Sequence, residues 1–360
     1  MSYYYTKNSR RGKQKKSKWR RLIFSVLLIL ILIGSGAGYL LYTIILKPNV
    51  WVQKEQTSIF ISSEASYQMV LDTLYSKGII IHRKNFEWLA QHKSYPELVK
   101  PGHYIIRAGM NNNELINLLR AGLQSPVDVT FNNLRTVEQL AANIAKQIET
   151  DSLSIITLLY DTAYIGQLGF NRQTIPALFI PNTYEFYWTT DATTFISRMF
   201  QEYRSFWNPS RLDKAKAIGL EPYEVSTLAS IIEKETNKQD EKATIAGVYL
   251  NRLKANWRLQ ADPTLVFASG DFGIQRVLDV HKLIDSPYNT YRNSGLPPGP
   301  ITIPDPTSID AVLNYETHRY YFFCAKDDLS GYHAFAETNR EHERNARAYR
   351  NALNKLNIKK

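Results

Sequence analysis

The longest hydrophobic stretch of the chain covers residues 22–46 (LIFSVLLILILIGSGAGYLLYTIIL), which contain no charged side chain. As a helix rising about 1.5 Å per residue, this stretch is long enough to cross a hydrocarbon core of about 30 Å with some tilt. The preceding residues 1–21 carry nine Lys and Arg side chains and no acidic one. Because positive charge marks the cytoplasmic side of a membrane helix, the pattern predicts a cytoplasmic basic arm (1–21), one transmembrane helix (22–46) and an extracytoplasmic chain from Lys47 onward.

A cleaved signal peptide is the alternative interpretation of this stretch. Its small-residue end would be residues 33–37 (IGSGA), but apolar residues resume at Tyr39 and continue to Leu46. No A-x-A cleavage site is present, so we favour an uncleaved, single-pass anchor in the cytoplasmic membrane.

Beyond the anchor, short runs of apolar residues alternate between the periods of strands and helices. In residues 47–125 they predict strands at 57–62 and 102–106 and helices at 65–77, 85–91 and 113–120. This pattern is typical of a small α+β subdomain. In residues 126–360 they predict helices at 136–148, 152–161, 194–206, 210–217, 221–236, 240–254 and 339–356, together with a strand at 127–131 and a buried strand at 319–325. The expected fold class is therefore α+β throughout, with a larger mixed domain over 126–360 whose proline-rich second half is richer in loops.

Charge and cysteine content exclude several classes of function. The formal net charge is +11, but the basic arm supplies nine of the positive charges and residues 22–360 hold 35 basic and 33 acidic side chains. A topology signal that also attracts anionic lipid explains the arm, so we expect no nucleic-acid partner. The single cysteine, Cys324, excludes an internal disulfide and a cysteine-based zinc cluster. The seven histidines show no metal-ligand spacing, so we expect neither a metal nor another cofactor.

One glutamate is the candidate catalytic residue. At 100° per residue, Glu235 falls within the apolar stripe of helix 221–236, which consists of Val225, Leu228, Ile231 and Ile232. Glu233 points roughly the opposite way, together with Ser226 and Ala229. Burial would raise the pKa of Glu235 and keep it protonated, as a general acid requires. Periodicity alone leaves an equal alternative, a half-solvated glutamate paired with Lys234 or Lys238.

Polar and aromatic loops near this helix favour a ligand groove. The segments LQADPT (259–264), YNTY (288–291) and GLPPGPI (295–301) are polar–aromatic or rigid turns, and GLPPGPI by itself is typical of a structural turn. The first two present side chains suited to a polyhydroxylated ligand, namely Gln260, Asp262, Tyr288 and Asn289.

These motifs resemble those of a known protein family. LASIIEKET (228–236), VYLNRL (248–253), LQADPT, YNTY with GLPPGPI, and GYHAFAETNREH (331–342) occur in the order found in the MltG (YceG-like) endolytic murein transglycosylases. Residues from about 57 to 124 resemble the family's LysM-like subdomain, and FIPNTYEF (179–186) resembles its F-P-D-T-Y segment. The chain has Asn182 where that segment usually has Asp, so an essential carboxylate is not expected there.

The resemblance implies a membrane-anchored peptidoglycan lytic transglycosylase, a carbon–oxygen lyase with Glu235 as its catalytic acid. It further implies cleavage of bonds between N-acetylmuramic acid and N-acetylglucosamine in nascent strands, which leaves 1,6-anhydro ends and terminates glycan elongation. Expected partners are glycan strands, the cytoplasmic membrane and proteins of peptidoglycan synthesis and elongation. The family positions in the substrate groove match Gln260, Asp262, Tyr288, Asn289 and Thr290, whereas His333, Phe335 and Thr338 match positions expected to be architectural.

Two other functions stay open at this stage. A non-catalytic, LysM-like scaffold of the synthesis machinery would bind glycan without forming products. An ordinary hydrolase would use Glu235 with a second acid such as Asp262, and would leave reducing ends.

Overall fold

The computed structural model describes residues 1–3, 11–274 and 276–355, with side chains described for 1–3 and from residue 18 onward. Lys7 and Arg10 of the predicted basic arm lie outside the described residues. Two compact units make up the chain, Met1–Pro126 and Val127–Lys360. This division falls one residue from the boundary that we expected between residues 125 and 126.

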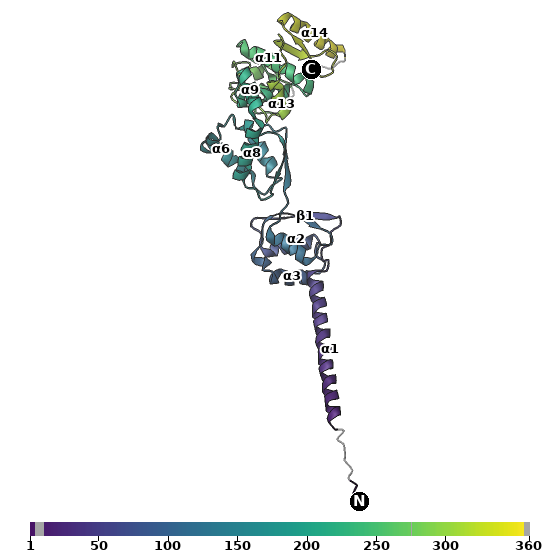
Figure 1. Cartoon of the computed structure of the whole chain (residues 1–360). Helices are drawn as coiled ribbons and strands as arrows, with labels where there is room; N and C mark the ends of the chain where they lie inside the picture. Colours follow the sequence, from purple (N-terminus) through teal and green to yellow (C-terminus); the bar gives the residue numbers. More distant parts are fainter. Residues whose placement is uncertain (4–10, 275, 356–360) are drawn as a thin grey trace. The chain divides into compact units, whose positions relative to one another are not determined.

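The first unit contains one long helix, α1 (Arg11–Ile45), whose apolar part follows Arg21 (Figure 1). By length and composition, the segment Lys18–Ile45 of α1 is long and apolar enough to cross a membrane. The helix ends one residue before the predicted limit at Leu46, and Ile44 is already buried in the hydrophobic cluster of the first unit. The buried Asn112 side chain fixes this last turn, because its Nδ2 donates to the Ile44 carbonyl oxygen at 2.7 Å. The helix and the folded part of the first unit are therefore one continuous structure.

The rest of the first unit is a two-stranded sheet covered by short helices. Its elements are β1 (Gln56–Ile61), α2 (Tyr67–Ser76), α3 (Arg83–His92), the 3-10 turn η1 (Tyr95–Glu97), β2 (Gly102–Arg107) and α4 (Asn112–Ala121). β1 and β2 pair antiparallel, with Gln56 opposite Arg107 and Ile61 opposite Gly102. The two strands and three helices confirm the predicted α+β pattern.

The first half of the second unit surrounds one hydrophobic cluster. Its elements are β3 (Val127–Phe131), α5 (Val137–Ile144), α6 (Ser152–Tyr160), α7 (Thr162–Gln167), η2 (Ile175–Leu178), β4 (Asn182–Phe186) and α8 (Ala192–Phe206). β3 pairs antiparallel with β4, which brings Phe131 opposite Asn182. β4 was not among the predicted strands.

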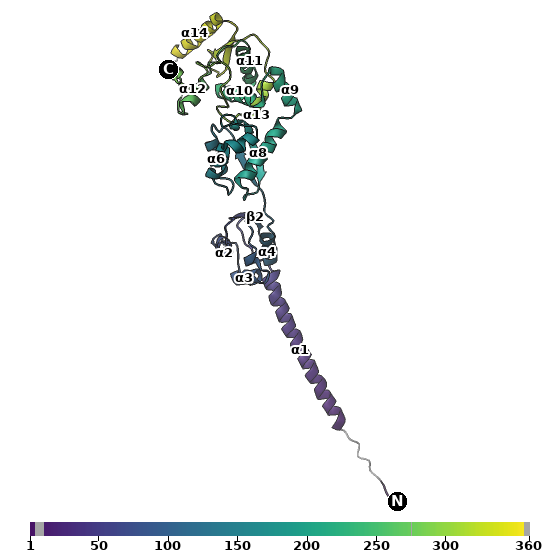
Figure 2. The same cartoon turned by 90° about the vertical axis from the view of Figure 1, so that its left-hand side faces the viewer.

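The second half of this unit is mostly helical, with α10 among its neighbours α11, α12 and α13 (Figure 2). Its elements are α9 (Pro209–Ile218), α10 (Pro222–Glu235), η3 (Gln239–Glu241), α11 (Lys242–Lys254), α12 (Asp262–Ser269), η4 (Asp279–Leu283), α13 (Pro306–Leu313), β5 (Phe322–Ala325), β6 (His333–Ala336) and α14 (Asn339–Lys355). The proline-rich region thus contains two helices, α12 and α13, where we expected loops. Pro263 and Pro306 lie in their first turns, where a missing N–H costs no helical hydrogen bond.

The predicted strand at 319–325 is shorter and less buried than expected. β5 covers only Phe322–Ala325, pairs antiparallel with β6, and each of its four residues is partly exposed. This hairpin packs against α14 at the end of the chain.

Candidate active site

Glu235 is the last residue of α10, a largely buried helix. All residues of α10 from Val225 to Ile232 are buried, including Ser226 and Ala229. The expected division of this helix into a core face and an outer face is therefore wrong, and Glu233 and Glu235 are both partly buried. Their hydrogen-bond partners, rather than helical periodicity, distinguish the two glutamates.

Glu233 binds the start of the neighbouring helix α13. Its Oε2 accepts hydrogen bonds from the Asp305 backbone N–H at 2.6 Å and from Ser308 Oγ at 3.1 Å. The carboxylate thereby satisfies donors at a helix N-terminus, where negative charge is favourable. Glu233 thus joins α10 to α13.

Glu235 instead receives one hydrogen bond from a buried tyrosine. Tyr249 of α11 donates from its hydroxyl to Glu235 Oε1 at 2.7 Å, and no protein group among the described residues donates to Oε2. Neither lysine of the alternative interpretation is its partner. Lys234 donates to Asn133 Oδ1 at 2.6 Å, and Lys238 Nζ lies 4.6 Å from the centroid of the Tyr332 ring.

Burial raises the pKa of Glu235 from its ordinary value of 4.5 to about 7. The Tyr249 hydrogen bond lowers this pKa, the negative charge of Asp262 raises it, and the positive charge of Arg252 lowers it. The C-terminal position in α10 acts in the same direction as burial, because the partial negative charge of a helix C-terminus disfavours a carboxylate. The pKa of Tyr249 itself lies well above 10 through burial, so this hydroxyl stays a donor.

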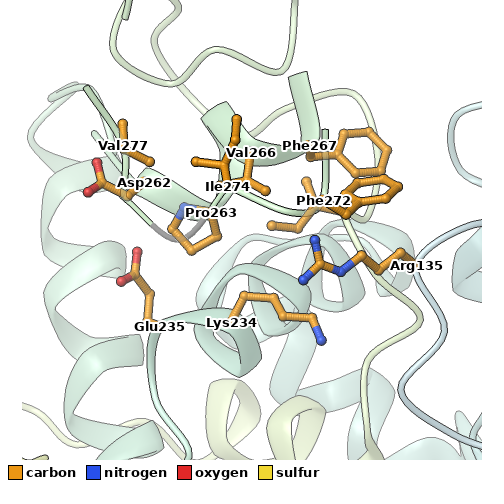
Figure 3. Close-up of a pocket in the computed structure, with 11 residues that line it drawn as sticks. Arg135, Lys234, Glu235, Asp262, Pro263, Val266, Phe267, Phe272, Ile274 and Val277 are labelled. Carbon is orange, nitrogen blue, oxygen red and sulfur yellow. The ribbon is translucent and has the colours of Figure 1, made fainter. Parts of the chain in front are cut away.

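Glu235 lines a cavity of about 280 Å³ in the second unit (Figure 3). Glu235 and Asp262 face each other across one end of it, and Arg135 and Lys234 lie toward the other. The remaining lining is apolar and comes mainly from α12 and the chain that follows it: Pro263, Val266, Phe267, Phe272, Ile274, Val277 and Ile301. Such a hollow, apolar with a few converging polar groups, is typical of a ligand site.

The five predicted groove residues take different positions around this cavity. Asp262 begins α12, lines the cavity and accepts a hydrogen bond from the Tyr291 hydroxyl at 2.6 Å. Gln260 is exposed outside the cavity lining, and its backbone has a φ of 51°. Tyr288 packs on Phe267 with ring centroids 4.6 Å apart and lines a neighbouring cavity of about 230 Å³.

Asn289 and Thr290 are buried, and their polar atoms bind the chain itself. Asn289 Nδ2 donates to the carbonyl oxygens of Lys282 and Ile284 at 3.0 and 2.8 Å, and its Oδ1 accepts from the Tyr291 N–H. Thr290 Oγ1 accepts from the Ala261 N–H at 3.0 Å. These positions suit residues that hold the 259–264 and 288–291 segments together rather than residues that touch a ligand.

Comparisons with known proteins identify the family. The sequence pattern of the YceG-like family matches residues 59–348. The chain belongs to this family. The endolytic murein transglycosylase of Bacillus subtilis (strain 168) is 30% identical over 335 residues, which cover 89% of this chain and 92% of that protein. The endolytic murein transglycosylase of Streptococcus pneumoniae serotype 2 (strain D39) is 27% identical, covering 94% of this chain and 66% of that protein. A crystal structure of a YceG-like protein from Listeria monocytogenes matches 81% of this chain and 99% of that chain, with 25% identity and a TM-score of 0.56.

Two further motifs of this YceG-like chain hold the segments around the site together. Gly299 of GLPPGPI approaches another loop so closely that a Cβ would lie 2.0 Å from the Gln173 carbonyl oxygen. Next along the chain, the Ile301 N–H donates to Ser230 Oγ of α10 at 3.0 Å. In the C-terminal motif, His333 Nδ1 lies 3.0 Å from Oε2 of the buried Glu241, which ties β6 to the chain just after α10. GLPPGPI is thus a structural turn, as expected from its composition.

Several site residues were missed by the sequence reasoning, although two of them lie in a quoted motif. Tyr249 and Arg252 both belong to VYLNRL, three residues apart on one face of α11. A tyrosine and an arginine that lie in one apolar motif need polar partners when they are buried, and this signal could have indicated that α11 faces Glu235. Arg135 and Phe272 carry no such local signal, because only the tertiary fold brings them to the cavity.

Proposed function

We propose that this YceG-like chain is a peptidoglycan lytic transglycosylase with Glu235 as its catalytic acid. The observation that carries the proposal is the partly buried carboxyl at the end of α10, whose pKa is raised to about 7 inside a cavity. A carboxyl with this pKa is protonated in a large fraction of molecules at neutral pH and can donate to a glycosidic oxygen. The relatives named endolytic murein transglycosylase support the same substrate class.

The reaction needs only this one carboxyl as acid and base. Glu235 protonates the oxygen of the bond between N-acetylmuramic acid and N-acetylglucosamine, and that bond breaks at C1 of the muramoyl ring. The resulting carboxylate accepts the proton of the muramoyl C6 hydroxyl, and the C6 oxygen bonds to C1. The product is a 1,6-anhydro end, Glu235 is protonated again, and no water is consumed.

The hydrogen bond from Tyr249 supports this cycle. It occupies Oε1 of Glu235, which leaves Oε2 for the proton that is transferred. Because the Tyr249 hydroxyl remains a donor, the same hydrogen bond also stabilises the carboxylate that forms after transfer. Asp262 opposes that carboxylate by its charge and so favours reprotonation.

The products of digestion test this function. Purified full-length chain is expected to release fragments with anhydro ends, which are lighter by one water molecule than fragments with reducing ends. Glu235→Gln should release none. Glu233→Gln is the matched control on the same helix, because the amide oxygen of the substituted side chain can still accept the bonds from Asp305 and Ser308, and it should keep its activity. Activity in Glu235→Gln with loss in Glu233→Gln would refute the assignment, and reducing ends would favour hydrolysis.

We further propose that α1 anchors the enzyme with its N-terminus in the cytoplasm, and that the second unit acts on nascent strands beside synthesis and elongation proteins. The basic arm and the apolar helix support this orientation. The burial of Ile44 in the first unit supports an anchor that is not cleaved. External protease should degrade the second unit in intact spheroplasts, and protection of that unit would refute the orientation.

A further inference from the structure

The cavity that contains Glu235 has a positively charged end that the proposed reaction does not use. Lys234 comes from α10, one residue before Glu235, and Arg135 comes from the loop between β3 and α5. Figure 3 shows both side chains at the end of the cavity away from Asp262. Only the tertiary fold brings these two cations together, since they are far apart in the sequence.

Neither cation is neutralised by the protein. Within the described part of the chain, no carboxylate lies at ion-pair distance from Arg135 or Lys234, and the acceptor for Lys234 Nζ is the neutral Asn133 side chain at 2.6 Å. Burial lowers the pKa of Lys234; the charge of Glu233 raises it, and the charges of Arg135 and Lys242 lower it. Two neighbouring cations repel each other, and an anion placed between them would relieve that repulsion.

The guanidinium of Arg135 is already held in place for such an anion. Its Cζ lies 4.8 Å from the centroid of the Phe272 ring, and the Arg135 backbone N–H donates to Gln139 Oε1 at 2.8 Å. A guanidinium stacked on an aromatic face keeps its N–H groups available for two parallel bonds to a carboxylate. A preorganised arginine also loses less conformational freedom when the ligand binds.

We propose that Arg135 and Lys234 form a carboxylate-binding subsite for the glycan substrate. The inference rests on the proposed function. The muramic acid residues of such a strand bear a lactyl carboxyl group, which is free in peptide-free strands. In peptide-bearing strands this group is an amide, and the peptide stems carry carboxylates of their own. N-acetylglucosamine has no such group. A carboxylate held beside Lys234 would therefore set which of the two alternating glycosidic bonds lies at Glu235.

Binding measurements with the full-length chain in detergent micelles test this subsite without cleavage, in a Glu235→Gln background. Three probes are compared: peptide-free strands, peptide-bearing strands, and peptide-free strands whose lactyl carboxyls have been converted to methylamides. Arg135→Gln and Lys234→Gln should each weaken binding of a carboxylate-bearing probe by about tenfold, the usual scale for one charge-assisted hydrogen bond. They should change binding of the methylamide probe by less than about twofold.

An exposed cation outside the cavity provides the control. Lys254 lies in the second unit and donates to the Tyr315 hydroxyl at 3.4 Å. Lys254→Gln should bind all three probes as the background protein does.

The outcomes identify the source of the carboxylate. If the variants lose affinity only for peptide-free strands, the subsite binds the lactyl carboxylate. If they lose affinity only for peptide-bearing strands, it binds the carboxylates of the peptide stems. No loss on any probe, equal loss on the methylamide probe, or no binding of any probe overturns the subsite. Product analysis with Glu235 restored separates this result from the proposed function: a chain that discriminates carboxylates but releases no anhydro ends keeps the subsite and refutes the lyase.

Discussion

Replacing Glu235 by glutamine should stabilise the second unit at alkaline pH while it abolishes activity. The pKa of Glu235 is about 7 in the folded protein against an ordinary 4.5. At about 1.4 kcal/mol per pH unit, ionisation costs about 3 kcal/mol more in the folded than in the unfolded chain. Water that reaches the cavity side of the carboxyl reduces this figure to about 2 kcal/mol. A neutral amide at this position carries no such cost and can still accept the Tyr249 hydrogen bond.

The pH dependence of the free energy of unfolding predicts at which pH the wild type and Glu235→Gln differ. Between pH 4.5 and 7 the folded protein retains a proton on Glu235 that the unfolded chain has lost, so the wild-type free energy of unfolding decreases as pH rises through this range. The variant lacks that decrease. The two proteins should therefore differ by less than about 1 kcal/mol at pH 5 and by about 2–3 kcal/mol in favour of Glu235→Gln at pH 8.

Urea denaturation of residues 127–360, followed by tryptophan fluorescence, measures this difference. Glu233→Gln is the control with the opposite sign, because it weakens two charge-assisted hydrogen bonds to the start of α13 and should destabilise the unit by about 1–2 kcal/mol at pH 8. If Glu235→Gln were no more stable than the wild type at pH 8, or if its advantage were the same at pH 5, the desolvation of Glu235 would be refuted.

Four other substitutions probe the same site. Tyr249→Phe removes a bond that lowers the Glu235 pKa, so the alkaline limb of the pH–activity profile should move to higher pH, with a stability loss of about 1–2 kcal/mol. Asp262→Asn removes a charge that raises this pKa, so the limb should move to lower pH, and a shift in the same direction as Tyr249→Phe would contradict the electrostatics. Asn289→Ala leaves two partly buried carbonyl oxygens without their donor and should lower the free energy of unfolding, measured by urea denaturation, by about 1–3 kcal/mol. Gly299→Ala should lower the thermal midpoint, because its Cβ meets backbone of another loop, and an unchanged midpoint would refute that contact.

The sequence predicts well what depends on local pattern. The apolar run predicts the α1 segment, the strand and helix periods predict most elements of the first unit, and the apolar period of residues 221–236 predicts the helix α10. Each of these features follows from residues that lie close together along the sequence. The helical wheel also places Glu235 toward the interior, although it wrongly places Glu233 with an outer face that α10 does not have.

The remaining features depend on contacts between distant segments. Asn289 and Thr290 look like polar ligand-binding residues in a loop, but they are buried because the 259–264 segment packs over them. The prolines after residue 260 suggest loops, whereas Pro263 and Pro306 each lie in the first turn of a helix. Arg135 reaches the cavity through the packing of two halves of the second unit. No local pattern in a single sequence predicts these contacts between distant segments.

The raised pKa of Glu235 makes the proposed reaction depend on the pH around the second unit. If the second unit lies outside the cytoplasmic membrane, its active site experiences external pH rather than the buffered pH of the cytoplasm. With a pKa of about 7, the protonated fraction of Glu235 is about nine-tenths at pH 6 and about one-tenth at pH 8. The rate of the first proton transfer should therefore fall by nearly tenfold between these values. Tyr249 and Arg252 lower the pKa of Glu235, whereas Asp262 raises it. Substitution of these neighbours can therefore shift the pH dependence of the rate in either direction without replacing the catalytic residue.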